Sequence, residues 1–199
     1  MDTTLYVVRH GQTEWHAENR YAGVSDVALT ETGREQAERL GRWAAGTGAA
    51  AVWSSPLSRS RATAAPAAAA LGLPLTIDGD LAEVDFGSAE GRTLAEMPAA
   101  DVDAFLADPV AGAFPGAEDP RKAVERGMAA LRRIASRHRG ERVLVVTHNT
   151  LMRLTLCGLL GIAPSAYRKV FPQVRNCAVT ELRIDGDVTA LMSYNVPVP

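Results

Sequence analysis

Two runs of apolar residues, both rich in valine, end in the same way, each leading into a histidine. Residues 5–8 are followed directly by Arg9 and His10, and residues 143–146 are followed after one threonine by His148. Continuous apolar runs of this length are typical of buried parallel strands. Ligands of open α/β sheets bind at the carboxyl ends of such strands. The pattern therefore predicts that both histidines lie at one candidate site.

The rest of the chain alternates between helical and strand patterns. Apolar residues at helical spacing predict a helix after Thr30, which would be its N-cap, and Gly46 would end it. Residues 50–53 predict a short strand, and the next helix would begin with Ser55 as its cap and Pro56 as its first helical residue. The pattern also predicts a strand at residues 73–77 and helices at residues 93–108, 120–139 and 151–160.

The last part of the chain predicts a hairpin. Residues 178–184 and 189–194 alternate between apolar and polar positions, and the Asp-Gly-Asp at residues 185–187 is a turn signal. We expect these two strands to lie antiparallel at the edge of the sheet. Strands and helices in this order predict a three-layer α/β sandwich. Because no linker or repeat interrupts it, the whole chain, residues 1–199, is expected to form a single domain.

Composition narrows the classes of function. Charged residues make up 22% of the chain and the formal net charge is -2, which provides no basic field for nucleic acid. The two cysteines, Cys157 and Cys177, form no CxxC pair, which suits a reducing compartment. The chain begins without a signal-peptide pattern, and no apolar run reaches transmembrane length. We therefore expect a cytoplasmic protein with no nucleic-acid or membrane partner.

Four side chains at the predicted sheet edge suit a phosphate monoester. Arg9 and His10 follow the first strand, His148 follows the later one, and Arg59 lies in the first turn of the helix after residues 50–53. The two arginines supply fixed forks of donors. With a charged His148, such a pocket would neutralise the roughly -1.5 to -2 charge of a phosphate monoester. We expect a small phosphorylated molecule as the substrate.

The same set predicts covalent catalysis by His10. A neutral imidazole nitrogen aimed at phosphorus can displace the alcohol and become a phosphohistidine, and its other nitrogen should donate to a backbone carbonyl. The leaving alkoxide needs a proton, and Glu83, in a glycine-punctuated loop, is the candidate donor. Asp85 and Glu90 in the same loop are the rivals, which we interpret as exposed or loop-stabilising carboxylates.

Together these motifs resemble the histidine phosphatase superfamily, which includes cofactor-dependent phosphoglycerate mutase. The resemblance covers nearly the whole chain and rests on four blocks: Arg9-His10-Gly11 with Thr13, Ser55-Pro56-Leu57 with Arg59, Leu81 with Glu83, and Val146-Thr147-His148. It implies that His10 is the phosphorylated nucleophile and Glu83 the proton donor. It also implies phosphate ligands at Arg9, Arg59 and His148, and no metal; no cofactor is expected. The implied fold is a mixed, mostly parallel six-stranded sheet with an antiparallel edge, flanked by helices.

The chain departs from the family pattern close to this site. His16 stands where the family commonly has an asparagine that contacts the phosphate. Ala22 replaces a polar loop residue, and Asn149 stands where glycine is common. A titratable His16 would make activity fall more steeply as pH rises, whereas packing against Trp15 is the structural alternative. The candidate substrate-binding residues are Gln12, His16, Ala22, Gly23 and Asn149.

One segment favours a phosphatase over a mutase. A mutase must keep water from its phosphohistidine and bind a phosphoglycerate carboxylate with extra basic residues. Similar mutases carry these residues in an insertion after the acid-bearing loop, whereas residues 93–120 contain neither arginine nor lysine. We therefore predict hydrolysis of a small phosphorylated metabolite, with phosphoglycerate-mutase-type transfer as the alternative. Residues 105–114 are expected to select the substrate.

Two interpretations from other classes stay open. A metal-dependent hydrolase would use as ligands His10, His16, His148 and Glu83, although the paired arginines repel a cation. The chain could also be a non-catalytic, phosphate-binding regulatory domain. A homodimer is compatible with the sequence, which carries no signal for the oligomeric state.

Overall fold

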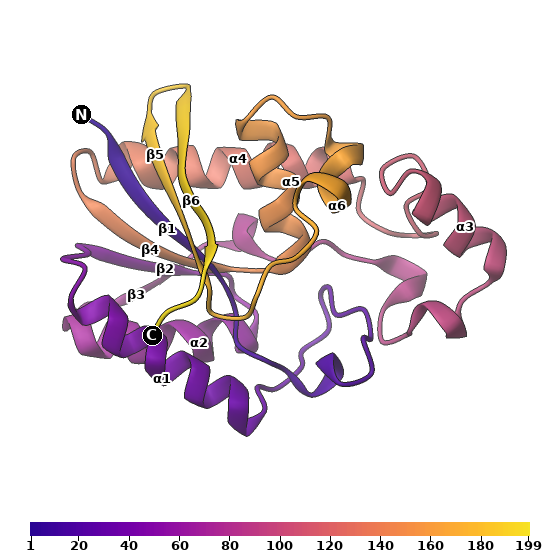
Figure 1. Cartoon of the computed structure of the whole chain (residues 1–199), viewed down its shortest axis with the longest axis horizontal. Helices are drawn as coiled ribbons and strands as arrows, with labels where there is room; N and C mark the ends of the chain where they lie inside the picture. Colours follow the sequence, from indigo (N-terminus) through magenta and orange to yellow (C-terminus); the bar gives the residue numbers. More distant parts are fainter.

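A computed structural model describes residues 1–199 and shows a six-stranded sheet with helices on both faces (Figure 1). The strands lie in the order β3-β2-β4-β1-β5-β6. Strands β3, β2, β4 and β1 run parallel, whereas β5 is antiparallel to β1 and to β6, which confirms the expected mixed sheet with an antiparallel edge. The bounds are Thr3–Arg9 (β1), Ala51–Ser54 (β2), Leu75–Ile77 (β3), Arg142–Thr147 (β4), Val179–Asp185 (β5) and Val188–Val196 (β6).

The pairing of β1 with β4 brings the two histidines next to each other. Arg9 of β1 lies opposite Thr147 of β4 in the parallel register. The backbone N–H of His10 donates to the carbonyl oxygen of Thr147 over 3.0 Å, so the pairing continues one residue past the strand. His10 and His148 therefore leave the sheet side by side at its carboxyl edge.

Helices form one layer on each side of the sheet (Figure 1). Alternate residues of β1 point to opposite faces, so Val8 packs in the apolar cluster under α1 and α2, and Val7 in the larger cluster under α4 and α5. This arrangement confirms the three-layer sandwich. None of the helices combines the length and apolar character needed to cross a membrane. The helices are α1 (Glu31–Ala45), α2 (Ser58–Leu71), α3 (Ala99–Ala107), α4 (Pro120–Arg137), α5 (Asn149–Leu159) and α6 (Tyr167–Val170).

The helix after β2 begins later than the sequence predicts. α2 starts at Ser58, not at Pro56 with Ser55 as its cap. The backbone N–H of Ser55 donates to the carbonyl oxygen of Val146 over 3.1 Å, so this residue still belongs to the edge of the sheet. The predicted cap was wrong because a pairing with a distant strand outweighs the local capping preference.

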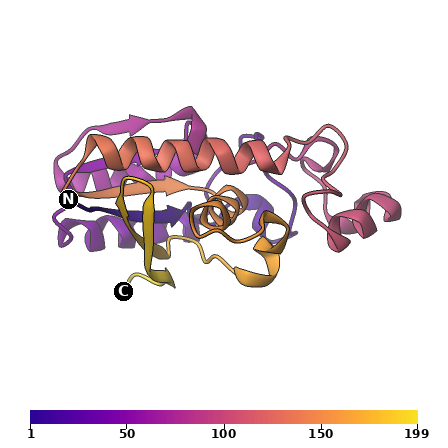
Figure 2. The same cartoon turned by 90° about the horizontal axis from the view of Figure 1, so that it is seen from above.

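The helix predicted at residues 93–108 is interrupted. A single 3-10 turn at Leu94–Glu96 is followed by an extended Met97 (φ -101°, ψ 157°), and α3 begins only after Pro98. Proline disfavours helical backbone in the residue before it, which accounts for the break. α3 lies at one end of the molecule, away from the sheet (Figure 2).

Candidate active site

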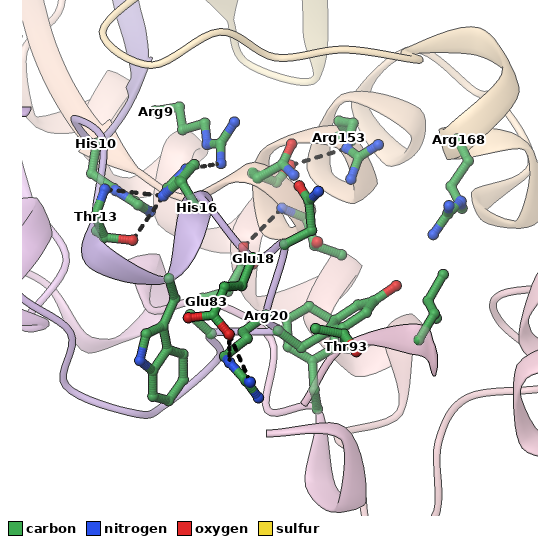
Figure 3. Close-up of a pocket in the computed structure, with 18 of the residues that line it drawn as sticks. Arg9, His10, Thr13, His16, Glu18, Arg20, Glu83, Thr93, Arg153 and Arg168 are labelled. Atoms are coloured by element: carbon green, nitrogen blue, oxygen red, sulfur yellow. Dashed lines mark hydrogen bonds and ion pairs between the residues drawn. The ribbon is translucent and has the colours of Figure 1, made fainter. Parts of the chain in front are cut away.

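A cavity of about 560 Å³ lies at the carboxyl ends of β1 and β4 (Figure 3). It coincides with the sheet edge at which the sequence places the candidate site. Its apolar lining consists of Trp15, Tyr21, Ala22, Phe86, Leu94, Ala95 and Tyr167. Its polar lining consists of Arg9, His10, Thr13, His16, Glu18, Asn19, Arg20, Glu83, Thr93, Asn149, Thr150, Arg153 and Arg168.

The imidazole of His10 presents one free nitrogen. Its Nδ1 lies 2.7 Å from the carbonyl oxygen of Gly11 and donates a proton to it, which leaves the lone pair on Nε2. Burial, followed by the proximity of His148 and Arg9, holds the pKa of His10 well below its usual value of 6.5. The ring is therefore neutral at pH 7, which is the form that a nucleophile requires.

His148 is fully buried, with its ring centroid 5.1 Å from that of His10. The hydroxyl of Ser55 accepts from the backbone N–H of Leu57 and lies 2.7 Å from Nε2 of His148, to which it can donate its proton. The proton of the neutral ring is then on Nδ1, a buried atom without a partner. Burial and then the Arg59 guanidinium hold the pKa of His148 well below its usual range, so the charged His148 of the sequence prediction is corrected to a neutral donor.

The guanidinium of Arg9 has two acceptors, because its Nη1 donates to the carbonyl oxygen of Val174 over 2.6 Å and its Nη2 donates to Nε2 of His16. Nδ1 of His16 lies 2.7 Å from the hydroxyl oxygen of Thr13, to which it donates the ring proton, so Nε2 of neutral His16 carries the lone pair. This Nε2 lies 2.5 Å from Nη2 of Arg9 and 3.3 Å from Nδ2 of Asn176. The amide of Asn176 is oriented by donating to the carbonyl oxygen of His10 over 2.8 Å. The donors that remain free for an oxygen of an anion are Nε of Arg9, Nε of Arg59 and Nδ1 of His148, each of them buried without a partner.

Arg59 is fully buried and holds the loop after β1 in place. Its Nη atoms donate to the carbonyl oxygens of Ala22, Gly23 and Ser25 over 2.6 to 3.1 Å. A Cβ on Gly23 would overlap the carbonyl oxygen of Val84, so only glycine fits there. Only Nε of Arg59 is left without a partner. The structure thus places Arg59 behind the cavity wall, and its predicted role as a phosphate ligand depends on this one atom.

The carboxylate of Glu83 lines the cavity and is held by the first turn of α5. Oε2 accepts from the backbone N–H of Thr150 over 2.9 Å, and Oε1 accepts from Leu151 over 2.7 Å and from Val84 over 3.0 Å. The amino end of a helix attracts a carboxylate because its amide N–H groups have no partner within the helix. Glu83 is 5% exposed, which is a position suited to exchanging a proton with a ligand in the cavity.

The two rival carboxylates bind their own loop. Asp85 accepts from the backbone N–H of Gly87 over 2.8 Å. Glu90 accepts from the backbone N–H of Phe86 and from the hydroxyl of Ser25, over 3.1 and 2.6 Å. Neither of them lines the cavity. Their interpretation as loop-stabilising residues agrees with these contacts.

Arg126 of α4 fixes the backbone that carries Glu83, a role that the sequence analysis did not identify. Its guanidinium donates to the carbonyl oxygens of Asp80, Ala82 and Glu83 over 2.7 to 3.2 Å. The same group pairs with the carboxylate of Glu118 over 2.7 Å. Arg126 is therefore a positioning residue for the candidate proton donor.

The predicted substrate-binding residues fall into two groups. His16, Ala22 and Asn149 line the cavity, and Oδ1 of Asn149 is buried without a partner. Gln12 does not line it, because its side-chain oxygen accepts from the hydroxyl of Thr30 over 2.8 Å. Gly23 also lies outside the lining, in contact with Arg59. A role for Gln12 or Gly23 in contacting the substrate has no geometric support.

Residues 105–114, which the sequence analysis expects to select the substrate, do not line the cavity either. Phe105 and Phe114 stack with their ring centroids 4.5 Å apart, and each is 3% exposed. Both pack edge-on against the ring of Tyr21, which does line the cavity. The selection of the substrate by this segment is therefore corrected to support of the cavity wall from behind.

Three arginines of the lining, Arg20, Arg153 and Arg168, were not predicted from the sequence as site residues. Arg153 lies one helical turn after Asn149 in α5, so the spacing of four residues places both on one face. That spacing is a signal that sequence analysis could have used. Arg168 belongs to the four-residue helix α6, which no periodicity in the sequence reveals.

The chain is similar to named proteins in sequence and in structure. A Salmonella paratyphi C protein named "Probable phosphoglycerate mutase GpmB" is 32% identical over 181 residues, which span 89% of this chain and 83% of that protein. Bacillus stearothermophilus YhfR has a TM-score of 0.90 and 30% identity, with 98% of this chain and 97% of that chain covered. Phosphoserine phosphatase from Entamoeba histolytica, in complex with 3-phosphoglyceric acid, has a TM-score of 0.86 and 24% identity, with 97% and 96% covered, a likeness that shows the fold alone.

A model of a whole protein family also matches the chain. It describes the histidine phosphatase superfamily, branch 1, and it matches residues 5–197, from the first residues of β1 to the residue after β6. The match therefore includes both strand ends from which His10 and His148 project, as well as the loop of Glu83. The protein belongs to branch 1 of the histidine phosphatase superfamily.

Proposed function

We propose that this protein is a phosphomonoester hydrolase that works through a phosphohistidine on His10 and needs no metal ion. The observation that carries the proposal is the lone pair on Nε2 of His10, in a site where Nε of Arg9, Nε of Arg59 and Nδ1 of His148 are buried donors without an acceptor. A nucleophile beside a cluster of donors is the arrangement that phosphoryl transfer requires.

The reaction has two steps: Glu83 gives up a proton in the first and takes up a proton in the second. First, Nε2 of His10 forms a bond to phosphorus and the ester P–O bond breaks, while Glu83 in its acid form gives its proton to the leaving oxygen. Then Glu83, now ionised, takes a proton from a water molecule whose oxygen attacks phosphorus. The P–N bond breaks, and inorganic phosphate and neutral His10 result. Arg9, Arg59 and His148 donate to the phosphate oxygens in both steps.

Residues 93–120 supply no basic side chain to the cavity, and this absence favours hydrolysis over mutase-type transfer. Phosphoglycerate-mutase-type transfer is the second candidate, because the relatives that are 32% and 34% identical are named as mutases. Arg153 and Arg168 also favour it, since they could bind the carboxylate of a phosphoglycerate from another side of the cavity.

The proposal is tested by measuring phosphate release from a panel of phosphomonoesters in the presence of a chelator, together with the interconversion of 2- and 3-phosphoglycerate. We expect phosphate release that the chelator leaves unchanged. Loss of activity on chelation and its recovery with a divalent cation would support the metal-dependent alternative. Interconversion with negligible phosphate release would support the mutase, and the absence of both would leave a regulatory domain.

The substitution of His16 by asparagine is expected to leave the shape of the pH profile unchanged between pH 6 and 8. Burial lowers the pKa of His16 to about 4, so this side chain is already neutral throughout that range and loses no charge within it. The steeper loss of activity with rising pH that a titratable His16 would cause is therefore not expected. The profile of kcat/KM for His16→Asn, set beside that of the wild type, checks this, since it reports groups of the free enzyme. A limb near pH 7 that disappears in the variant would contradict it.

A further inference from the structure

The wall of the cavity formed by α5 and α6 carries two arginines that the proposed phosphoryl transfer does not use. Arg153 projects from α5 and is 8% exposed, and Arg168 projects from α6 and is half-buried. Figure 3 shows both side chains across the cavity from His10 and His16. The cavity thus has two separate groups of cationic side chains.

The charge of Arg153 is not neutralised by any neighbouring group. Its Nε and Nη1 donate only to backbone carbonyl oxygens, those of Asn149 over 3.3 Å and Phe171 over 3.4 Å, which are long hydrogen bonds. Its Cζ lies 4.8 Å from the ring centroid of Tyr167. No carboxylate lies within ion-pair distance of Arg153, although burying an unpaired charge is costly.

The charge of Arg168 is likewise not neutralised by a carboxylate. Its Cζ lies 5.0 Å from the ring centroid of Phe105, and it forms no ion pair. Arg20, in the same cavity, is different, because Glu18 and Glu96 neutralise it at 2.7 and 2.8 Å. Burial lowers the pKa of Arg153 against the opposing effects of Tyr167 and Glu83, whereas burial of Arg168 is outweighed by its interactions with Tyr21 and Tyr167, which raise its pKa.

We propose that Arg153 and Arg168 bind a second anionic group of the substrate, a carboxylate or a second phosphate, while the phosphoryl group to be cleaved lies at His10. A guanidinium offers two parallel donors that match the oxygens of either group. The rings of Tyr167 and Phe105 lie within cation–π distance of the two guanidinium groups, at 4.8 and 5.0 Å, and help to orient them. The inference rests on the proposed hydrolase function and defines its substrate class.

Matched pairs of substrates test the inference. 3-Phosphoglycerate and glycerol 3-phosphate differ only in a carboxylate that is replaced by a hydroxymethyl group. Propane-1,3-diol bisphosphate and its monophosphate differ only in the second phosphate. We expect kcat/KM to be about tenfold or more higher for the member with two anionic groups in at least one pair, the gain expected from a charge-assisted hydrogen bond. The pair that shows the gain identifies the second group, and equal values within both pairs would overturn the inference.

Variants of Arg168 test whether this gain in kcat/KM comes from the wall of the cavity formed by α5 and α6. Arg168→Gln is expected to reduce the ratio of kcat/KM within the discriminating pair by about tenfold. Lys169→Gln is the matched control, because Lys169 is exposed, follows Arg168 in α6 and does not line the cavity. An unchanged ratio in Arg168→Gln, or an equal reduction in Lys169→Gln, would overturn the assignment. Arg168→Lys, which keeps the charge but not the fork, is expected to fall between the two.

A binding measurement separates this inference from the proposed reaction. Calorimetric titration of His10→Ala protein with both members of a pair reports binding without turnover. Tighter binding of 3-phosphoglycerate or of the bisphosphate supports the second anion site even if no hydrolysis is found in the wild type. Hydrolysis of p-nitrophenyl phosphate by the wild type without any preference within the pairs would instead keep the hydrolase function and overturn the second anion site.

Discussion

Replacing His10 with alanine is expected to lower kcat/KM for every phosphomonoester by about four orders of magnitude or more, because the first step then has no nucleophile. The loss is large because burial and the proximity of His148 keep the pKa of His10 well below 6.5, so nearly all of the wild-type enzyme holds the reactive, neutral ring at pH 7. Phosphate release measures the loss. Quenching in alkaline detergent, in which the P–N bond of phosphohistidine survives, after incubation with a ³²P-labelled substrate should retain label on the wild-type protein and none on the variant.

His138→Ala is the matched control for that experiment. His138 follows α4 and lies 3.2 Å from Nε1 of Trp53, so it does not contact the cavity. Its removal should leave turnover unchanged, and the Tm of both variants shows whether they are folded. Wild-type turnover in a folded His10→Ala protein would exclude a covalent role for His10.

The strands that position the site could be predicted from the sequence because their signals are local. The apolar runs before His10 and His148 are continuous, and only a parallel pair buried on both faces needs such runs. The Asp-Gly-Asp turn likewise predicts the hairpin of β5 and β6. These elements follow from residues that are neighbours in the chain.

The contacts made by the site residues could not be predicted, because they depend on residues far apart in the chain. Ser55 is a good helix cap by sequence, yet its backbone pairs with Val146 and its hydroxyl with His148. Arg59 was expected to face the phosphate, yet its Nη groups bind three loop carbonyls. A side chain's residue type restricts its possible partners, whereas tertiary packing selects among them.

The charge of the cavity likewise depends on residues that are far apart in the chain. Residues 93–120 contain no arginine or lysine, and this segment alone predicts a substrate site with few cations. The structure brings Arg153 and Arg168 to the cavity from α5 and α6 instead. The charge of residues 93–120 therefore does not determine the charge of a cavity that five separate segments of the chain build.

Glu83→Gln is expected to lower kcat for alkyl phosphates by about 10² to 10⁴-fold, the usual contribution of a general acid or base. p-Nitrophenyl phosphate should behave differently, because nitrophenolate leaves without a proton. Its first step then stays fast, whereas attack by water still lacks a base. The variant should therefore release one equivalent of nitrophenolate in a burst and then turn over slowly, with phosphohistidine accumulating. Rapid mixing measures the burst, and labelling with an alkaline quench measures the phosphohistidine.

The control for this prediction is Asp85→Asn, the same change of a carboxylate to an amide in the same loop. Asp85 accepts only from the backbone N–H of Gly87, and the amide oxygen of asparagine can accept that bond, so little change is expected. Glutamine at position 83 also leaves the amide N–H of Thr150 without a carboxylate, which the Tm of the variant would report. Equal losses for alkyl and nitrophenyl esters without a burst would mean that Glu83 stabilises the start of α5 and transfers no proton, because only a proton donor makes the loss depend on the leaving group.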